Sequence, residues 1–106
     1  MSSPQPPFYV SCSDANWEPI RRWYQRAVAR GLGDEFQTAV REMYRRLSAD
    51  PETFGDPLYP YRDVNWTVYH GMSDMLRVHY AVDPVRRIVY VKQFLLVPWH
   101  PLHECF

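Results

Sequence analysis

Hydrophobic and polar positions change their spacing once along the chain. Between residues 14 and 50 the apolar side chains recur every three to four positions, as on the buried face of an amphipathic helix. From residue 64 to residue 97 apolar and polar side chains mostly alternate, which is typical of strands with one buried face. The pattern predicts helices followed by a small sheet, which is an α+β fold.

The helical half is expected to form two helices with a short link. Asp14 or Asn16 can cap the first helix, and Gly31 and Gly33 end it, because glycine adopts the left-handed conformation of a C-cap cheaply. The second helix begins at Asp34 and stops before Pro51, since the residue before a proline disfavours helix. So short a link predicts an antiparallel hairpin. The positions expected to be buried are Ile20, Trp23, Ala27 and Val28 in the first helix and Phe36, Ala39, Val40, Met43 and Leu47 in the second.

The remaining segments are expected to build the sheet. Strands are predicted over residues 8–12, 64–70, 75–83 and 87–97, and the stretch 51–63, with three prolines, is expected to be an irregular connection. The order is then β-α-α-β-β-β, with the helical hairpin packed on one face of a small antiparallel sheet. Residues 1–7 are expected to form a disordered N-terminus, 8–98 the one domain and 99–106 a C-terminal tail.

Composition bears on the compartment and the partners. The chain has only two cysteines among its 106 residues, too few for a disulfide framework, so a reducing compartment is expected. Neither a signal peptide nor a membrane-spanning stretch is visible, and we expect a cytoplasmic protein without membrane association. Its net charge is zero, although residues 21–46 carry a charge of +4. Zero net charge disfavours non-specific nucleic-acid binding but leaves room for a local basic groove.

The turns predict which residues share a sheet face. If Asp83 and Arg86 flank a two-residue turn, Arg77 lies opposite Lys92 and His79 lies opposite Tyr90. A three-residue turn would instead place Gln93 opposite Arg77. A two-residue turn at residues 71–74 would pair His70 with Met75 and Val68 with Arg77. The apolar face expected against the helices holds Leu76, Val78, Tyr80, Val82, Val89, Val91 and Leu95.

The opposite face is the candidate site, and it carries His70, Arg77, His79, Tyr90 and Lys92. Like charges opposite one another destabilise a sheet, so pairing the only lysine with an arginine favours a site for an anion such as phosphate. The histidines and the tyrosine add groups for proton transfer or base stacking. A polar face that is merely wetted by solvent would give the same pattern. His100 and His103 have no Cys/His framework around them, so neither a metal nor another cofactor is expected.

Two runs resemble the RelE/ParE toxin family. The run DEFQTAVREMYRRLSADPETFGDPL (34–58) is similar to the family's second helix and its exit, and LRVHYAVDPVRRIVYVKQF (76–94) is similar to its hairpin. With the predicted element order, the resemblance covers residues 8–98. It implies the toxin of a type II toxin–antitoxin pair in bacteria, a plasmid-stabilisation system, held inactive by a cognate antitoxin protein.

The resemblance leaves three functions open. RelE-like members are mRNA interferases that cut mRNA on the ribosome without a metal, whereas ParE-like members inhibit DNA gyrase by binding, and a relative could have lost toxicity and act only as a binding module. Arg77 matches the ribonucleases' middle-strand arginine, which contacts the scissile phosphate. Their lysines before that strand correspond here only to Arg62 and His70, and their last-strand arginine is replaced by the run 96–98.

The resemblance to the ribonucleases implies a role for each candidate site residue. Arg77 and Lys92 would stabilise the phosphorane, and His79 or His70 would transfer protons, with Tyr90 beside them. Phe94, Leu96 and Trp99 would either cover part of the sheet or form the surface that the antitoxin binds.

Overall fold

The two spacings of the sequence produce two layers in the computed structural model, which describes residues 7–61 and 63–97. The elements are β1 (Tyr9–Ser11), α1 (Asp14–Ala29), α2 (Gly33–Ala49), α3 (Pro51–Phe54), β2 (Asp56–Pro60), β3 (Thr67–Ser73), β4 (Leu76–Asp83) and β5 (Ile88–Leu96). One five-stranded sheet has the order β1-β5-β4-β3-β2. Because β1 runs parallel to β5 while the other neighbours are antiparallel, the sheet is mixed and not purely antiparallel as predicted.

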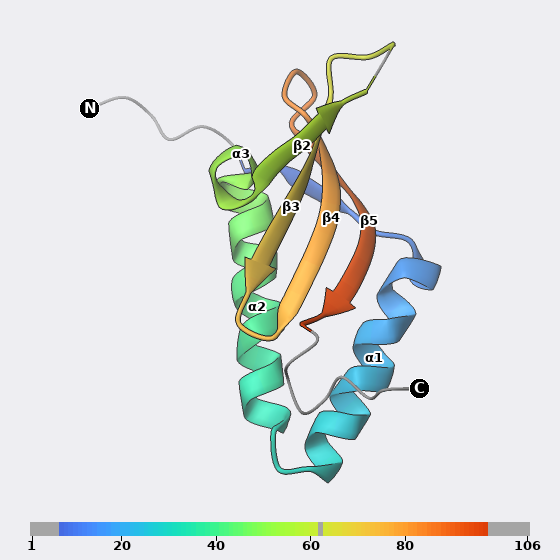
Figure 1. Cartoon of the computed structure of the whole chain (residues 1–106), viewed down its shortest axis with the longest axis vertical. Helices are drawn as coiled ribbons and strands as arrows, with labels where there is room; N and C mark the ends of the chain where they lie inside the picture. The colour runs from blue at the N-terminus through green and yellow to red at the C-terminus, as the bar shows by residue number, and fades with distance from the viewer. Residues whose placement is uncertain (1–6, 62, 98–106) are drawn as a thin grey trace, which may run out of the picture.

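The helical hairpin covers one face of the sheet, as expected (Figure 1). Its first helix is capped by Ser13, not by Asp14 or Asn16, since the Ser13 hydroxyl accepts a hydrogen bond of 3.1 Å from the backbone N–H of Asn16. Gly31 has a φ of 75°, which confirms that this glycine ends the helix in the left-handed conformation, whereas Gly33 does not end it but is the first residue of α2. We call the sheet face against the helices the inner face and the opposite one the outer face.

The core lies between the hairpin and the inner face. Among its members, the predicted positions Ile20, Ala27, Phe36, Ala39, Met43, Leu47, Leu76, Val78, Tyr80, Val82, Val89 and Val91 are all buried. Three predictions of burial for the helices fail in part: Val28 is 53% exposed, and Trp23 and Val40 are only partly buried. Trp17 and Tyr24 also pack on the core, so the stripe of α1 that contacts the core runs from Trp17 to Ala27 and leaves out Val28.

The connection 51–63 is not wholly irregular, and the prediction missed both α3 and β2. Pro51 starts α3, where its missing N–H costs nothing. β2 is an edge strand, and an edge tolerates its two prolines. Gly55 joins the two elements. A larger residue does not fit there, because a Cβ at this position would lie 2.6 Å from the Tyr80 hydroxyl and 2.8 Å from the His70 carbonyl oxygen.

The predicted pairing of β4 with β5 is wrong. Arg77 pairs with Leu95, neither Lys92 nor Gln93, and His79 pairs with Gln93, whereas Tyr90 lies opposite Ala81. One cause is the loop, which has four residues and is fixed by Asp83, whose carboxylate accepts hydrogen bonds of 3.1 Å from the N–H groups of two loop residues.

The other cause is a β-bulge in β5 opposite the step from His79 to Tyr80, where Lys92 is the extra residue. One extra residue reverses the alternation beyond it. Phe94 and Leu96 therefore lie in the core, and Leu95 faces outward, against the prediction for this residue.

The predicted pairing of β3 with β4 is wrong by four positions. His70 pairs with His79 and Val68 with Ala81, because β3 continues through Ser73 and the turn contains only Asp74 and Met75. An even shift preserves which face each side chain occupies. His70 and Arg77 thus share the outer face as expected.

Candidate functional site

Three polar side chains meet in the middle of the outer face. His70 on β3 lies directly opposite His79 on β4, and their imidazole rings contact edge to face with centroids 5.1 Å apart. Arg77 is two residues before His79 and so shares its face. Its Nε donates a hydrogen bond of 3.2 Å to Nε2 of His70. We call His70, Arg77 and His79 the outer-face triad.

The triad combines one fixed cation with two imidazoles. Nε2 of His70 is the acceptor of this hydrogen bond, so the proton of this ring is assigned to Nδ1. Partial burial lowers the pKa of His79, and the nearby His70, Arg77 and Lys92 lower it further. A neutral imidazole beside a guanidinium is suited to accept a proton next to a bound anion.

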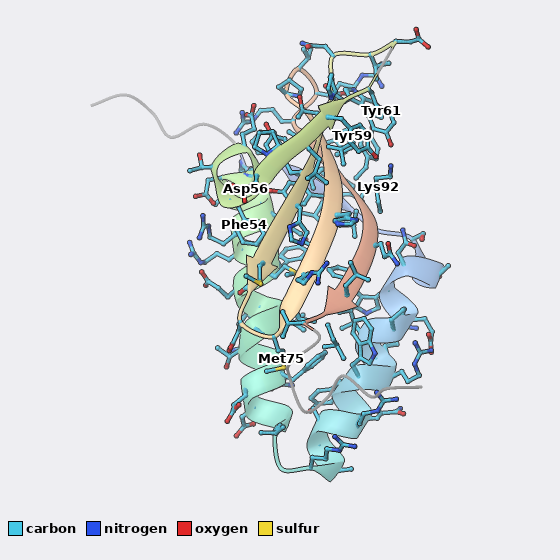
Figure 2. All side chains as sticks on the ribbon, viewed as in Figure 1. Phe54, Asp56, Tyr59, Tyr61, Met75 and Lys92 are labelled. Carbon is cyan, nitrogen blue, oxygen red and sulfur yellow. The ribbon has the colours of Figure 1, made fainter. Side chains whose placement is uncertain are left out.

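A hollow of about 300 Å³ adjoins the triad on the outer face. It is lined by Leu58, Tyr59, Val68, His79, Lys92 and Gln93. Lys92 is the extra residue of the bulge and lies on this side, where its Nζ lies 5.1 Å from the centre of the Tyr61 ring. Tyr59, Tyr61 and Lys92 gather at the same end of the sheet in Figure 2.

Lys92 is the ammonium group of this hollow. Its hydrogen bond to Tyr61, and to a lesser degree its interaction with Tyr59, raise its pKa, so the side chain stays charged at neutral pH. On the far side of the triad, Asp56 on β2 is paired with His70 and adds one exposed carboxylate. The centre of the face is therefore cationic, with a single acid at its edge.

An aromatic cluster borders the hollow. Trp66 stacks on Tyr90 with ring centroids 4.7 Å apart, and Tyr61 meets Trp66 edge to face at 5.8 Å. These rings shield the outer face locally, since Val68 and Ala81 lie on it and are nevertheless only 1% exposed. Tyr90 is thus placed in packing contact with Trp66, away from the triad.

The structure brings together some of the predicted site residues. His70, Arg77 and His79 meet, and Lys92 lies beside His79 at the hollow. Phe94 and Leu96 are 8% and 6% exposed on the inner side, where Phe94 lines a hollow beside the helices, and Trp99 lies outside the described residues.

Sequence reasoning missed the contribution of β2 to the site. Tyr59 lines the hollow, but its segment carries prolines and shows no alternation, so nothing in the pattern predicted a strand there. Gln93 was considered only as a partner of Arg77, and it enters the hollow because the bulge rotates it outward.

The described residues contain no group of three or more histidine, cysteine or acidic side chains that could hold a metal ion. Within the same residues, no helix is long and apolar enough to cross a membrane. Comparison with protein families, with curated proteins and with solved structures finds no match to this chain. The outer face, with its triad and hollow, is therefore the feature of the molecule that bears on function.

Proposed function

We propose that this chain is the toxin of a type II toxin–antitoxin pair of the RelE/ParE kind, and that it cleaves RNA on the outer face. The observation that carries the proposal is the contact among Arg77, His70 and His79 beside the hollow that Lys92 lines. A guanidinium and an ammonium bind a phosphate, and a neutral imidazole next to them can take a proton.

The fold supports the proposal at a coarser level. A helical hairpin on one face of the sheet and three consecutive antiparallel strands, β3 to β5, agree with the order that the family resemblance implies. The helices leave the outer face open, so a single RNA strand can reach the triad, and the aromatic rings of Tyr59 and Tyr61 at its end are suited to stack on bases.

The chemistry proposed is an internal transesterification. His79 takes the proton of a ribose 2′-hydroxyl, the 2′-oxygen bonds to phosphorus, and the bond from phosphorus to the 5′-oxygen breaks. Arg77 and Lys92 stabilise the charge on the pentavalent phosphorus, and the Lys92 ammonium donates the proton that the 5′-oxygen needs. The products are a 2′,3′-cyclic phosphate and a 5′-hydroxyl, and no metal is required.

A ParE-like action is the second candidate, and one observation favours it. The end of β5 is apolar: Leu96 and Val97 are buried, where the resemblance would place a catalytic arginine. In that case the outer face would bind a protein target, DNA gyrase in the family, and would not turn over RNA. A non-toxic binding module is the remaining alternative.

Induced expression in a bacterium tests the toxin proposal. We expect growth arrest with the wild-type chain and growth with Arg77→Ala or His79→Ala. Arg86→Ala is the matched control, because this arginine lies in the loop after β4 and its side chain is 73% exposed. Growth that continues with soluble wild-type protein would contradict a toxin and leave a binding module.

A further inference from the structure

An apolar groove runs between α1 and α2, on the side of the molecule away from the triad. It consists of a hollow of about 300 Å³ that reaches β1 and Cys12, and a second of about 430 Å³ that reaches Tyr24 and Phe36. Both are lined by Trp17, Ile20, Val40 and Tyr44, so they form one continuous groove.

The described residues leave this groove incompletely covered. Tyr44 is 54% exposed, and Trp17, Tyr24 and Val40 are only partly buried although they contact the core. Two cations, Arg21 and Arg41, line the half that lies toward the turn between the helices. An apolar floor with a cationic border is suited to an occupant that is apolar and carries an acidic group.

The chain leaves the sheet beside this groove. The backbone N–H of Val97 donates a hydrogen bond of 2.9 Å to the carbonyl oxygen of Met75, which Figure 2 labels below the lower end of the sheet, at α2. Leu76 and Phe94, next to this bond, line the groove floor. Val97, the last residue that the structure describes, therefore lies next to Leu76, one of the residues that line the groove.

The sequence after Val97 has the composition that the groove would accept. Residues 98–106, PWHPLHECF, contain Trp99, Leu102 and Phe106 and the single acid Glu104. Two prolines disfavour a helix in this segment. Nine extended residues reach roughly 30 Å, which exceeds the length of roughly 24 Å expected for a helix such as α1.

We infer that residues 98–106 bind in the groove between α1 and α2 of their own chain. Trp99 and Leu102 fill the apolar floor near Val40, and Glu104 lies near Arg21 or Arg41. The segment thereby occupies a surface that a partner protein could use only after displacing it. This inference does not depend on the proposed RNA chemistry.

Thiol labelling tests the inference on the full chain. The reporter is Val40→Cys, in the part shared by both hollows, in a background with Cys12→Ser and Cys105→Ser. Replacing Trp99 and Leu102 by serine should make maleimide label this thiol about tenfold faster, which corresponds to about 1.4 kcal/mol of docking free energy. The double variant His100→Ala/His103→Ala is the matched control and should leave the rate unchanged.

Two further readings keep the test decisive. A second reporter, Val28→Cys, lies on the exposed side of α1 and should label equally fast with either tail, which shows that the fold is intact. Equal labelling of Val40→Cys with the wild-type and the serine tail would overturn the inference. Protection that grows with protein concentration would also overturn it, because the occupant would then be a second copy of the chain.

Discussion

The Nε of Arg77 is bonded to Nε2 of His70 across the β3–β4 pair, at 3.2 Å. This bond occupies Nε and fixes the plane of the guanidinium. The two terminal nitrogens stay available to bind a phosphate. His70 is thus a positioning residue in this account: it acts through Arg77, while His79 meets the substrate.

Replacing His70 tests the positioning role. We expect His70→Ala to reduce RNA cleavage by about tenfold to a hundredfold, since misplacing a catalytic group by about 1 Å has an effect of this size. His70→Gln should restore most of the rate, because an amide oxygen can accept the same bond from Nε. Single-turnover rates on a ribosome-bound message measure both. Equal losses in the two variants would indicate that the imidazole itself reacts.

The pH profile of cleavage tests His79 as the base. Since burial and neighbouring cations lower its pKa below the ordinary value of about 6.5, the imidazole is already neutral at pH 7. The rate should therefore fall only when the pH drops below that ordinary value. In His79→Gln the residual rate should lose this acid limb. An unchanged acid limb in the variant would assign the base to another group.

The same lowered pKa predicts a stability effect with a definite sign. Between the two pKa values the unfolded chain binds more protons at His79 than the folded chain does, so the stability due to neutral His79 is present above about pH 6.5 and is lost as the pH falls through the folded pKa. Urea unfolding at pH 7 and pH 5 should show a smaller acid-induced loss in His79→Gln than in the wild type. An equal or larger loss in the variant would contradict the lowered pKa.

The bulge at Lys92 predicts unequal effects at two adjacent positions. Phe94→Ala should lower the free energy of unfolding by about 3–5 kcal/mol, because it leaves a cavity in the core. Leu95→Ala should have a clearly smaller effect, since Leu95 faces outward opposite Arg77. Denaturant unfolding of the two variants decides between this register and the predicted one, in which the two effects would be reversed.

Tyr80 offers a separate test of the core. Its buried hydroxyl donates a hydrogen bond of 2.6 Å to the carbonyl oxygen of Pro51, which ties β4 to α3. Tyr80→Phe leaves that carbonyl without its donor and should lower the free energy of unfolding by about 1–3 kcal/mol. Tyr9→Phe is the control, because Tyr9 is largely exposed and should change stability by less than about 0.5 kcal/mol. A similar, small change in both variants would argue against the bond.

The helical hairpin and the identity of the buried residues of β4 were predictable, because each depends on the regular spacing of apolar residues within one segment. The apolar residues of α2, from Phe36 to Leu47, and the alternation from Leu76 to Val82 are visible in the sequence and are confirmed. A period also assigns faces, and His70, Arg77 and His79 were grouped correctly on one side.

The register was not predictable in the same way. The run from Ile88 to Leu96 ends in consecutive apolar residues, so the sequence does not show which of them face the core. The extra residue at Lys92 is therefore not visible in the pattern. β2 was concealed by its prolines, which only its position at the sheet edge allows. Both features depend on contacts between strands distant in sequence, and the hollow at Lys92 depends on both.

The most direct test of the central claim is a map of mRNA 5′ ends after a short induced pulse of the wild-type chain and of Arg77→Ala. The account predicts new 5′-hydroxyl ends inside translated codons with the wild type and their loss in the variant. Growth arrest without new ends would contradict cleavage on the outer face and favour the gyrase-binding alternative.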